Sequence, residues 1–216
     1  MYKDSDNQRD ELDYYPTDIR IPQAALRKLP VRGFSTVIDA GAGSGIWGDV
    51  IKPRFLCNLI GVELREVEPN PNYTTWITGN FLTVDLPHAD LVTGNPPYLY
   101  ALEFVLRGLE LVKRRTGVLY YLLPLNFLAG KERKELIYDV IPPQDVYVLS
   151  LRPSYSADGK TAINTQYALY KWDMGKPIKA PTLHFMHFKQ DTAPRSVSLA
   201  GLALWEALCR MKSSKK

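Results

Sequence analysis

The sequence contains few cysteines and no long hydrophobic run, and each shortage excludes a class of protein. Only two of the 216 residues are cysteines, Cys57 and Cys209, and their spacing fits neither a disulfide framework nor a metal site. No apolar run reaches the length of a membrane span, and residues 1–6 are too polar for a signal peptide. We therefore expect reduced thiols, no membrane partner and a cytoplasmic location.

Histidine is also scarce, and the charge balance is mild. Two of the three histidines, His184 and His187, lie in an alternating segment without further zinc ligands, so we predict strand residues and no metal site. The net charge of +4 permits a nucleic-acid partner without requiring one. With 45% hydrophobic and 23% charged residues, the composition is that of one globular domain with at most a small appendage.

A glycine-rich turn follows the first strand-like segment. β-branched residues from position 36 lead to the pattern Gly41-x-Gly43-x-Gly45, and we expect a helix to begin near Ile46. Glycine lacks a Cβ atom and tolerates positive φ, so the backbone of this turn can approach a ligand closely. The spacing is tighter than in dinucleotide-binding turns, and no lysine follows as in a P-loop, which argues against nucleotide hydrolysis.

Polar residues at the ends of the next strands are candidate ligand contacts. Glu63 ends a second strand, 59–63, and an acid at this position usually holds ribose hydroxyls. Asp39, just before the glycine turn, is either a ligand residue or a strand-end turn residue. After a third apolar piece, Asn80 can bind an adenine edge, while Phe81 packs on the adenine face or belongs to the core.

The sharpest motif is Asn95-Pro96-Pro97-Tyr98, which follows the short apolar strand 91–93. The two prolines fix φ and lack N–H groups, so they form a stiff corner with outward carbonyls. At the carboxyl end of a parallel strand, such a corner lies where open α/β sheets bind ligands. The Asn95 oxygen and the Pro96 carbonyl are two acceptors beside the aromatic face of Tyr98, which suits a planar group carrying an NH2.

The rest of the chain alternates helices and strands. Helical spacing marks residues 100–114, and a charged helix is expected over 131–139. Further strands are expected at 118–123, 146–151 and 165–172.

Three loop segments add candidate contacts. Asn126 follows strand 118–123, and Lys160 lies in a polar, turn-rich loop whose residue types hold phosphates and stack on bases, although a solvated connection has a similar composition. Tyr15 and Thr17 belong to an extended turn before a helix near 22–29, for which Thr17 or Asp18 is a candidate N-cap.

In this order, the motifs resemble the S-adenosylmethionine-dependent amino-methyltransferases, and among them the N6-adenine DNA methyltransferases of small phage or prophage type. The Asn95 corner marks methylation of an amino or amide nitrogen, whereas the glycine turn indicates only the cofactor class. The resemblance covers about residues 14–172 and rests on Tyr14–Thr17, Asp39–Gly45, Glu63, Asn80-Phe81, Asn95–Tyr98, Pro124–Phe127 and Asp158–Thr161.

The resemblance implies an α/β, Rossmann-like class I methyltransferase fold, with a seven-stranded, mostly parallel sheet and an antiparallel last strand. It implies S-adenosyl-L-methionine as the cofactor and nucleic acid, with DNA favoured, as the partner. The implied catalytic residues are Asn95, Pro96, Pro97 and Tyr98, and the implied substrate contacts are Tyr98, Asn126 and Lys160. The implied cofactor contacts are Tyr15, Thr17, Asp39, Gly41, Gly43, Gly45, Glu63, Asn80, Phe81 and Asn95.

The implied reaction is methyl transfer to the N6 amino group of adenine in DNA. The alternatives are adenine in RNA, a protein glutamine, and a catalytically silent subunit that grips nucleic acid. Glutamine enzymes of this kind usually carry a helical N-terminal domain, and only some 35 residues precede the first strand here, so that substrate is the least favoured. The intact Asn95 corner argues against a silent subunit. If a phage encodes the chain, the location is the host-cell cytoplasm.

Two features depart from the family pattern. We expect residues 1–175 to form the methyltransferase domain, with an N-terminal segment that closes over the cofactor, and 176–216 to form a C-terminal extension. This leaves no separate target-recognition domain, so sequence preference is an open question. The second departure is Asn80, where relatives commonly have an acid, and this bears on cofactor affinity rather than on the chemistry.

Overall fold

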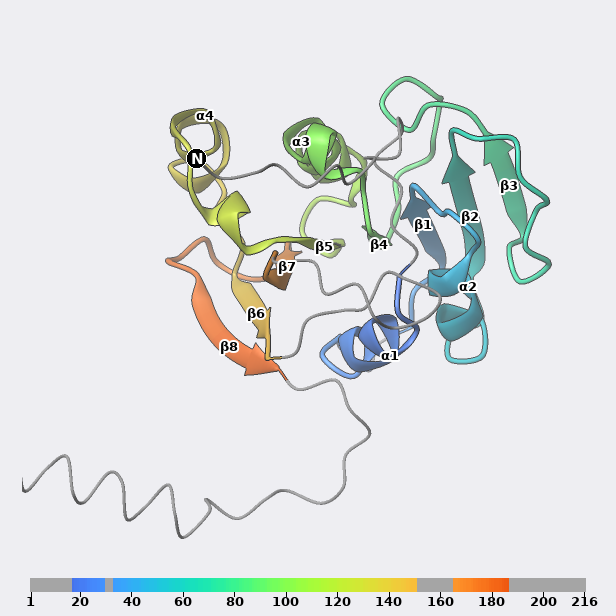
Figure 1. Ribbon diagram of the computed structural model, residues 1–216, viewed down its shortest axis with the longest axis horizontal. Helices are drawn as coiled ribbons and strands as arrows, with labels where there is room; N and C mark the ends of the chain where they lie inside the picture. The colour runs from blue at the N-terminus through green and yellow to red at the C-terminus, as the bar shows by residue number, and fades with distance from the viewer. Residues whose placement is uncertain (1–16, 30–32, 151–164, 187–216) are drawn as a thin grey trace, which may run out of the picture.

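A single twisted sheet forms the centre of the computed structural model, which describes residues 17–29, 33–150 and 165–186 (Figure 1). Within these residues the sheet has eight strands in the order β3-β2-β1-β4-β5-β7-β6-β8. The strands are β1 (Thr36–Ala40), β2 (Asn58–Glu63), β3 (Thr75–Thr78), β4 (Leu91–Gly94), β5 (Val118–Pro124), β6 (Asp145–Leu149), β7 (Tyr167–Asp173) and β8 (Thr182–Met186).

Neighbouring strands are parallel except where β7 takes part. β7 runs antiparallel to both β5 and β6, whereas β3, β2, β1, β4 and β5 form one parallel block. This arrangement confirms the predicted mostly parallel sheet with an antiparallel part, but the antiparallel strand is β7, and the last strand, β8, is parallel to β6. The predicted number of seven strands is wrong, because β8 adds an eighth.

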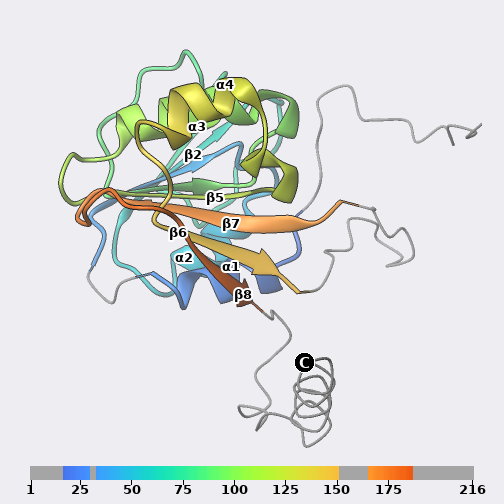
Figure 2. The ribbon, with the colours of Figure 1, turned by 90° about the vertical axis from the view of Figure 1, so that its left-hand side faces the viewer.

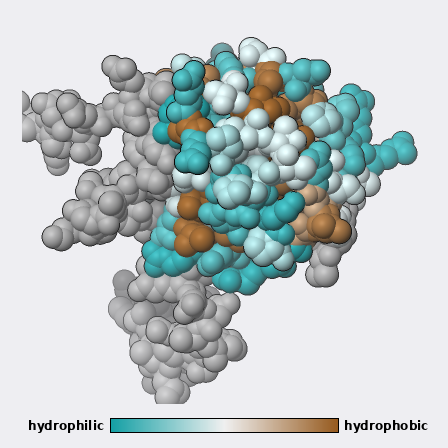
Figure 3. Space-filling view, turned by 90° about the vertical axis from the view of Figure 1, so that its right-hand side faces the viewer, coloured by the Kyte–Doolittle hydropathy of each residue, from teal (hydrophilic) through white to brown (hydrophobic). Residues whose placement is uncertain are grey.

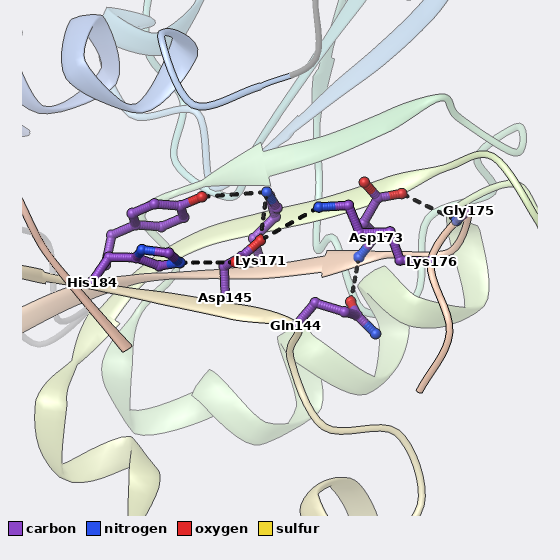
Figure 4. A network of polar contacts seen from close by, with 8 residues as sticks. Gln144, Asp145, Lys171, Asp173, Gly175, Lys176 and His184 are labelled. Carbon is purple, nitrogen blue, oxygen red and sulfur yellow. Dashed lines mark hydrogen bonds and ion pairs between the residues drawn. The ribbon is translucent and has the colours of Figure 1, made fainter. Parts of the chain in front are cut away.

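The additional strand is held by parallel pairing and by a polar cluster across three strands. β8 pairs in parallel with β6, and Asp145 at the start of β6 contacts Lys171 of β7 at 2.6 Å and His184 of β8 at 2.9 Å (Figure 4). Lys171 is only 4% exposed, so its ammonium group needs this carboxylate partner. The prediction that His184 is a strand residue is confirmed, and His187 lies outside the described residues.

Helices cover both faces of the sheet. Figure 2 shows α1 (Arg20–Leu26) and α2 (Ile46–Ile51) on one face, and α3 (Ala101–Leu111) and α4 (Lys131–Arg133) on the other. α4 continues as a π-helical turn, Lys134–Tyr138, so the single helix predicted over 131–139 has two parts. Short 3₁₀ turns at Tyr98–Tyr100 and Leu125–Leu128 follow β4 and β5.

The sheet divides the hydrophobic core into two layers. Successive side chains of a strand point to opposite faces. Val37 accordingly packs with α1 and α2, whereas its neighbour Ile38 packs with α3. Tyr120, Tyr121 and Trp172 are completely buried near the middle of the sheet. With both faces covered, the strand ends are the places where a ligand can reach the sheet.

The loops after β1, β2, β4 and β5 all leave the sheet at the carboxyl ends of its strands, on the same side, because these strands are parallel. In such sheets ligands bind at the carboxyl ends of the strands. Seen from the β3 side, the surface carries small groups of hydrophobic residues among hydrophilic and neutral ones (Figure 3). No helix in the described ranges is long and apolar enough to cross a membrane.

Candidate active site

A cavity of about 330 Å³ opens at the carboxyl ends of the parallel strands, between the glycine loop after β1 and the Asn95 corner after β4. Its walls bring together segments that are far apart in the sequence. The predicted site residues that line it are Thr17, Gly41, Gly43, Glu63, Asn80, Phe81, Asn95 and Pro97.

The other predicted site residues that the structure describes do not line the cavity. Asp39, Gly45, Pro96, Tyr98 and Asn126 are near this edge of the sheet but are not part of the cavity wall. Tyr15 and Lys160 lie outside the described residues, so their predicted roles stay predictions.

The three glycines of the loop all have positive φ, but they have different neighbours. Their φ values are 72° for Gly41, 59° for Gly43 and 89° for Gly45, a region that other residues rarely adopt. Gly41 and Gly43 line the cavity. A Cβ atom at Gly45 would instead lie 2.6 Å from the side chain of Asn70, so this glycine permits packing against the loop before β3.

Glu63 is the last residue of β2, and its carboxylate is held by two residues. Oε2 accepts the Gly43 N–H at 2.7 Å, and Oε1 accepts the Arg65 backbone N–H at 3.0 Å and its Nε–H at 2.7 Å. The residue is only 6% exposed. A carboxylate has about four acceptor sites, and three donors engage this one, so some acceptor capacity remains. Arg65 could not be predicted as a site residue, because a cation two residues from an acid is common on any surface.

Asp39 lies beneath the glycine loop and is completely buried. Its Oδ2 accepts the Tyr73 hydroxyl at 2.5 Å. The alternation of β1 accounts for this position, since Asp39 follows Val37 on the face that packs with α1 and α2. Asp39 does not line the cavity, and its predicted role as a ligand residue stays a prediction.

The charge of Asp39 makes folding stability depend on pH. Burial raises the pKa of this carboxyl group to about 7, the Tyr73 hydrogen bond lowers it, and the charge of Glu63 raises it. The folded protein therefore holds a proton that the unfolded chain releases above pH 3.8. This contribution to stability is complete below that pH and is lost as the pH rises to about 7.

We predict that Asp39→Asn removes this dependence. The free energy of unfolding of the variant relative to the natural chain should increase by about 4 kcal/mol between pH 4 and pH 8, because about three pKa units disappear. Urea unfolding across this pH range measures the difference. Asp85→Asn is the matched control, because it removes an exposed carboxyl group. A pH-independent difference for Asp39→Asn would contradict the prediction.

The Asn95 side chain points into the cavity wall with both ends of its amide bonded. Nδ2 donates to the Thr17 hydroxyl at 3.1 Å, and Oδ1 accepts the Tyr98 hydroxyl at 2.8 Å. Gly94, with φ of 146°, gives the backbone the turn that precedes the two prolines. The amide is thus fixed by a residue before α1 and by a residue after the prolines.

The segment before α1 both binds the first turn of the helix and contacts Asn95, two roles that were predicted as alternatives. Asp18 binds the first turn of the helix, because its Oδ1 accepts the Arg20 backbone N–H at 3.0 Å. Thr17 is therefore not needed as the cap, and its hydroxyl bonds Asn95 across the cavity edge.

Aromatic residues surround the corner. Tyr98 packs its half-buried ring on Tyr167, with centroids 5.4 Å apart. Phe81 stacks on Phe104 with centroids 4.9 Å apart and is 2% exposed, so it belongs to the core and to the cavity wall at once.

Asn80 and the cavity rim complete the site. The Oδ1 atom of Asn80 accepts the Leu82 N–H at 3.0 Å and so closes a local turn. Leu64, Leu99 and Tyr100 line the cavity while being 57%, 74% and 49% exposed. This apolar rim was not predicted, although Leu99 and Tyr100 directly follow the Asn95 corner in the sequence. Asn126 is exposed on the 3₁₀ turn after β5.

No group of three histidine, cysteine, aspartate or glutamate side chains within the described part of the chain is arranged to hold a metal ion. The cavity is lined by the amides of Asn80 and Asn95, by the charged Glu63 and Arg65, by the backbone of the glycine loop and by apolar side chains.

Comparisons with known proteins agree with the fold. No protein-family model matches the chain. A tRNA1(Val) (adenine(37)-N6)-methyltransferase of Tolumonas auensis is 30% identical over 103 residues, which span 42% of this chain and 44% of that protein, so less than half of the relative is matched.

Solved structures extend the comparison over more of the chain. A type I restriction-modification methyltransferase subunit from Streptococcus thermophilus has a TM-score of 0.58 at 16% identity and covers 94% of this chain and 54% of its own. A protein from Listeria monocytogenes described as a class I S-adenosylmethionine-dependent methyltransferase has a TM-score of 0.58 at 10% identity, over 92% of this chain and 72% of that one. At these identities the likeness shows the fold, which is that of the class I methyltransferases.

Proposed function

We propose that this chain is an S-adenosylmethionine-dependent methyltransferase that modifies the N6 amino group of adenine in nucleic acid. The observation that carries the proposal is the position of Asn95, whose amide lines a cavity shared with the glycine loop. An amide acceptor beside a cofactor-sized cavity is what an amino-group methyltransferase requires.

The cavity fits the proposed cofactor. Its volume of about 330 Å³ lies within the usual range for small-molecule sites of about 300–1,000 Å³. Gly41 and Gly43 leave room for close backbone approach, Glu63 has acceptor capacity for hydroxyl groups, and Phe81 gives a flat apolar wall. When bound, S-adenosylmethionine supplies a methyl group on a positively charged sulfur.

Asn95 and Pro96 act on the amino group that is to be methylated. The N6 lone pair of adenine is delocalised into the ring, which makes it a poor nucleophile. The Asn95 Oδ1 atom, with one lone pair engaged by Tyr98, and the Pro96 carbonyl each accept one amino hydrogen. Two such acceptors favour a pyramidal nitrogen and stabilise the positive charge that develops on it. No general base is assigned.

The bonds to Asn95 have a function of their own in this proposal. Thr17 accepts from Nδ2 and Tyr98 donates to Oδ1, so together they hold the amide in one position. An acceptor that is fixed before the substrate arrives needs no reorganisation during the reaction. Tyr98 and Asn126 contact the target base in this assignment, with Tyr98 reaching it from beside the cavity wall.

DNA is the first candidate substrate and RNA the second. DNA is supported by the N-terminal Tyr14–Thr17 motif, and RNA by the relative whose name describes a tRNA methyltransferase. In a duplex, the target adenine must leave the base stack, which costs a few kcal/mol. Residues 1–175 form the methyltransferase domain in this proposal and 176–216 a C-terminal extension, in which β8 joins the same sheet.

Transfer of a radiolabelled methyl group tests the proposal. The purified chain should label duplex DNA or single-stranded DNA above RNA and cell protein, and digestion of the product should give N6-methyladenosine in its deoxy form. Labelling of RNA alone would support the second candidate. Binding of nucleic acid without any labelled product would favour a silent binding subunit and would overturn the enzymatic proposal.

A further inference from the structure

Tyr73 lies below the glycine loop, with its ring seated between two glycines. A Cβ atom at Gly48 in α2 would lie 2.3 Å from this ring, and one at Gly61 in β2 would lie 2.7 Å from it. Trp76 packs edge-on against the ring, with centroids 5.0 Å apart and an interplanar angle of 88°. The ring therefore fills a space that exists only because both neighbours are glycine.

The Tyr73 hydroxyl joins the two ends of the cofactor loop. It donates to Asp39 Oδ2 at 2.5 Å and accepts the Gly48 N–H at 3.0 Å. The loop, residues 41–45, begins directly after the β1 strand that carries Asp39 and ends at the α2 helix that carries Gly48. One side chain from outside the loop thus connects the elements on both sides of it.

Asp39 also faces the Asn95 corner. Its Oδ1 is buried and has no hydrogen-bond partner within the described residues. A Cβ atom at Gly94 would lie 3.1 Å from this oxygen and 2.5 Å from the Ala40 carbonyl oxygen. Gly94 directly precedes Asn95, so the Asp39 carboxyl group lies between the base of the loop and the base of the corner.

The groups that face Asp39 set its charge. Burial raises the pKa of Asp39 to about 7, the Tyr73 hydrogen bond lowers it, and the Glu63 charge raises it. Tyr121, on β5, has a pKa raised by burial and by the Asp39 charge. Tyr73 also has a raised pKa, through burial, through Asp39 and, more weakly, through Asp49, so both phenols stay neutral near pH 7. Among these groups, the Tyr73 hydroxyl favours the charged carboxylate.

We propose that Tyr73 is a positioning residue that fixes the cofactor loop against the Asn95 corner and favours the carboxylate form of Asp39 beneath the cavity. The inference rests on the proposed function of that cavity. A carboxylate below the cavity favours a cationic ligand over a neutral one of the same shape. S-adenosylmethionine and its demethylated product, S-adenosylhomocysteine, differ by one methyl group and one positive charge, so they are the matched probes.

Calorimetric titration of both compounds between pH 5.5 and 9 tests this inference. In the natural chain, the affinity for S-adenosylmethionine relative to S-adenosylhomocysteine should rise as the pH passes through about 7, where Asp39 becomes charged. In Tyr73→Phe, the midpoint of this rise should move upward by about one pH unit, because a hydrogen bond to the charged form is lost. Asp39→Asn should abolish the rise.

Tyr138→Phe is the matched control, since it removes a hydroxyl that donates to the Phe127 carbonyl at 2.7 Å, away from the loop. It should keep the midpoint of the natural chain. If Tyr73 only fills space, Tyr73→Phe will weaken the binding of both compounds equally and leave the pH midpoint unchanged. That result overturns the inference. If the natural chain binds neither compound at any pH, the proposed function itself fails, which is a different outcome.

Discussion

Replacing Asn95 by alanine should lower the rate of methyl transfer by about 10²–10³-fold, because an oriented acceptor for the developing charge is removed. S-adenosylmethionine affinity should change little, since the glycine loop and Glu63 are intact. Single-turnover transfer of a labelled methyl group measures the rate, and calorimetry measures the affinity. The variant also loses the bonds to Thr17 and Tyr98, so its thermal unfolding must be compared with that of the natural chain.

A conservative variant and a control variant test this prediction further. Asn95→Asp keeps acceptor oxygens at the same place, so it should retain more activity than Asn95→Ala. Asn58→Ala removes an exposed asparagine at the start of β2, on the opposite edge of the sheet, and should transfer methyl groups at the natural rate. Full turnover by Asn95→Ala would refute the assigned role of the amide.

Much of the architecture was predictable because local patterns mark where strands end. The glycine turn and the Asn95 corner each follow a short apolar strand, and in a parallel sheet such ends lie at one edge. The cavity between the two loops therefore follows from the sequence once the strands are recognised. The direction of each strand-end side chain does not follow, and Asp39 illustrates this, because the alternation of β1 sends it below the loop.

The partners across long sequence separations could not be predicted. Tyr73 reaches Asp39 only because β3 pairs beside β2 and brings the preceding loop under the first turn of α2. The visible signal was indirect: Gly48 and Gly61 are glycines inside a helix and a strand, where no turn requires them. Close approach of another side chain explains both.

The predicted seven-stranded sheet did not include β8, although the segment around His184 was predicted to be a strand. Leu183 and Phe185 are 56% and 83% exposed, so β8 lacks the apolar pattern of a buried strand. Its place depends on the polar cluster around Asp145, which joins residues from three strands. A carboxylate, a lysine and a histidine at these separations give no local signal that they will meet.

Replacing Gly43 by valine should reduce S-adenosylmethionine affinity by at least about 100-fold. The residue has φ of 59°, which a β-branched side chain adopts only with strain, and its position in the cavity wall puts the new side chain where the ligand binds. The Gly43 N–H also donates to Glu63 Oε2, so a shifted backbone would move the carboxylate proposed to hold the ribose. Calorimetry measures the affinity, and near-ultraviolet circular dichroism checks that the variant is folded.

Gly33→Val is the matched control for this substitution. A Cβ atom at Gly33 meets no heavy atom within 4 Å, and this glycine is not among those with positive φ. Gly33→Val should therefore bind S-adenosylmethionine as the natural chain does. If Gly43→Val were folded and bound the cofactor with natural affinity, the glycine loop would not be the binding element. Because the cavity is shared, the proposed function of the Asn95 corner would then lose its source of methyl groups as well.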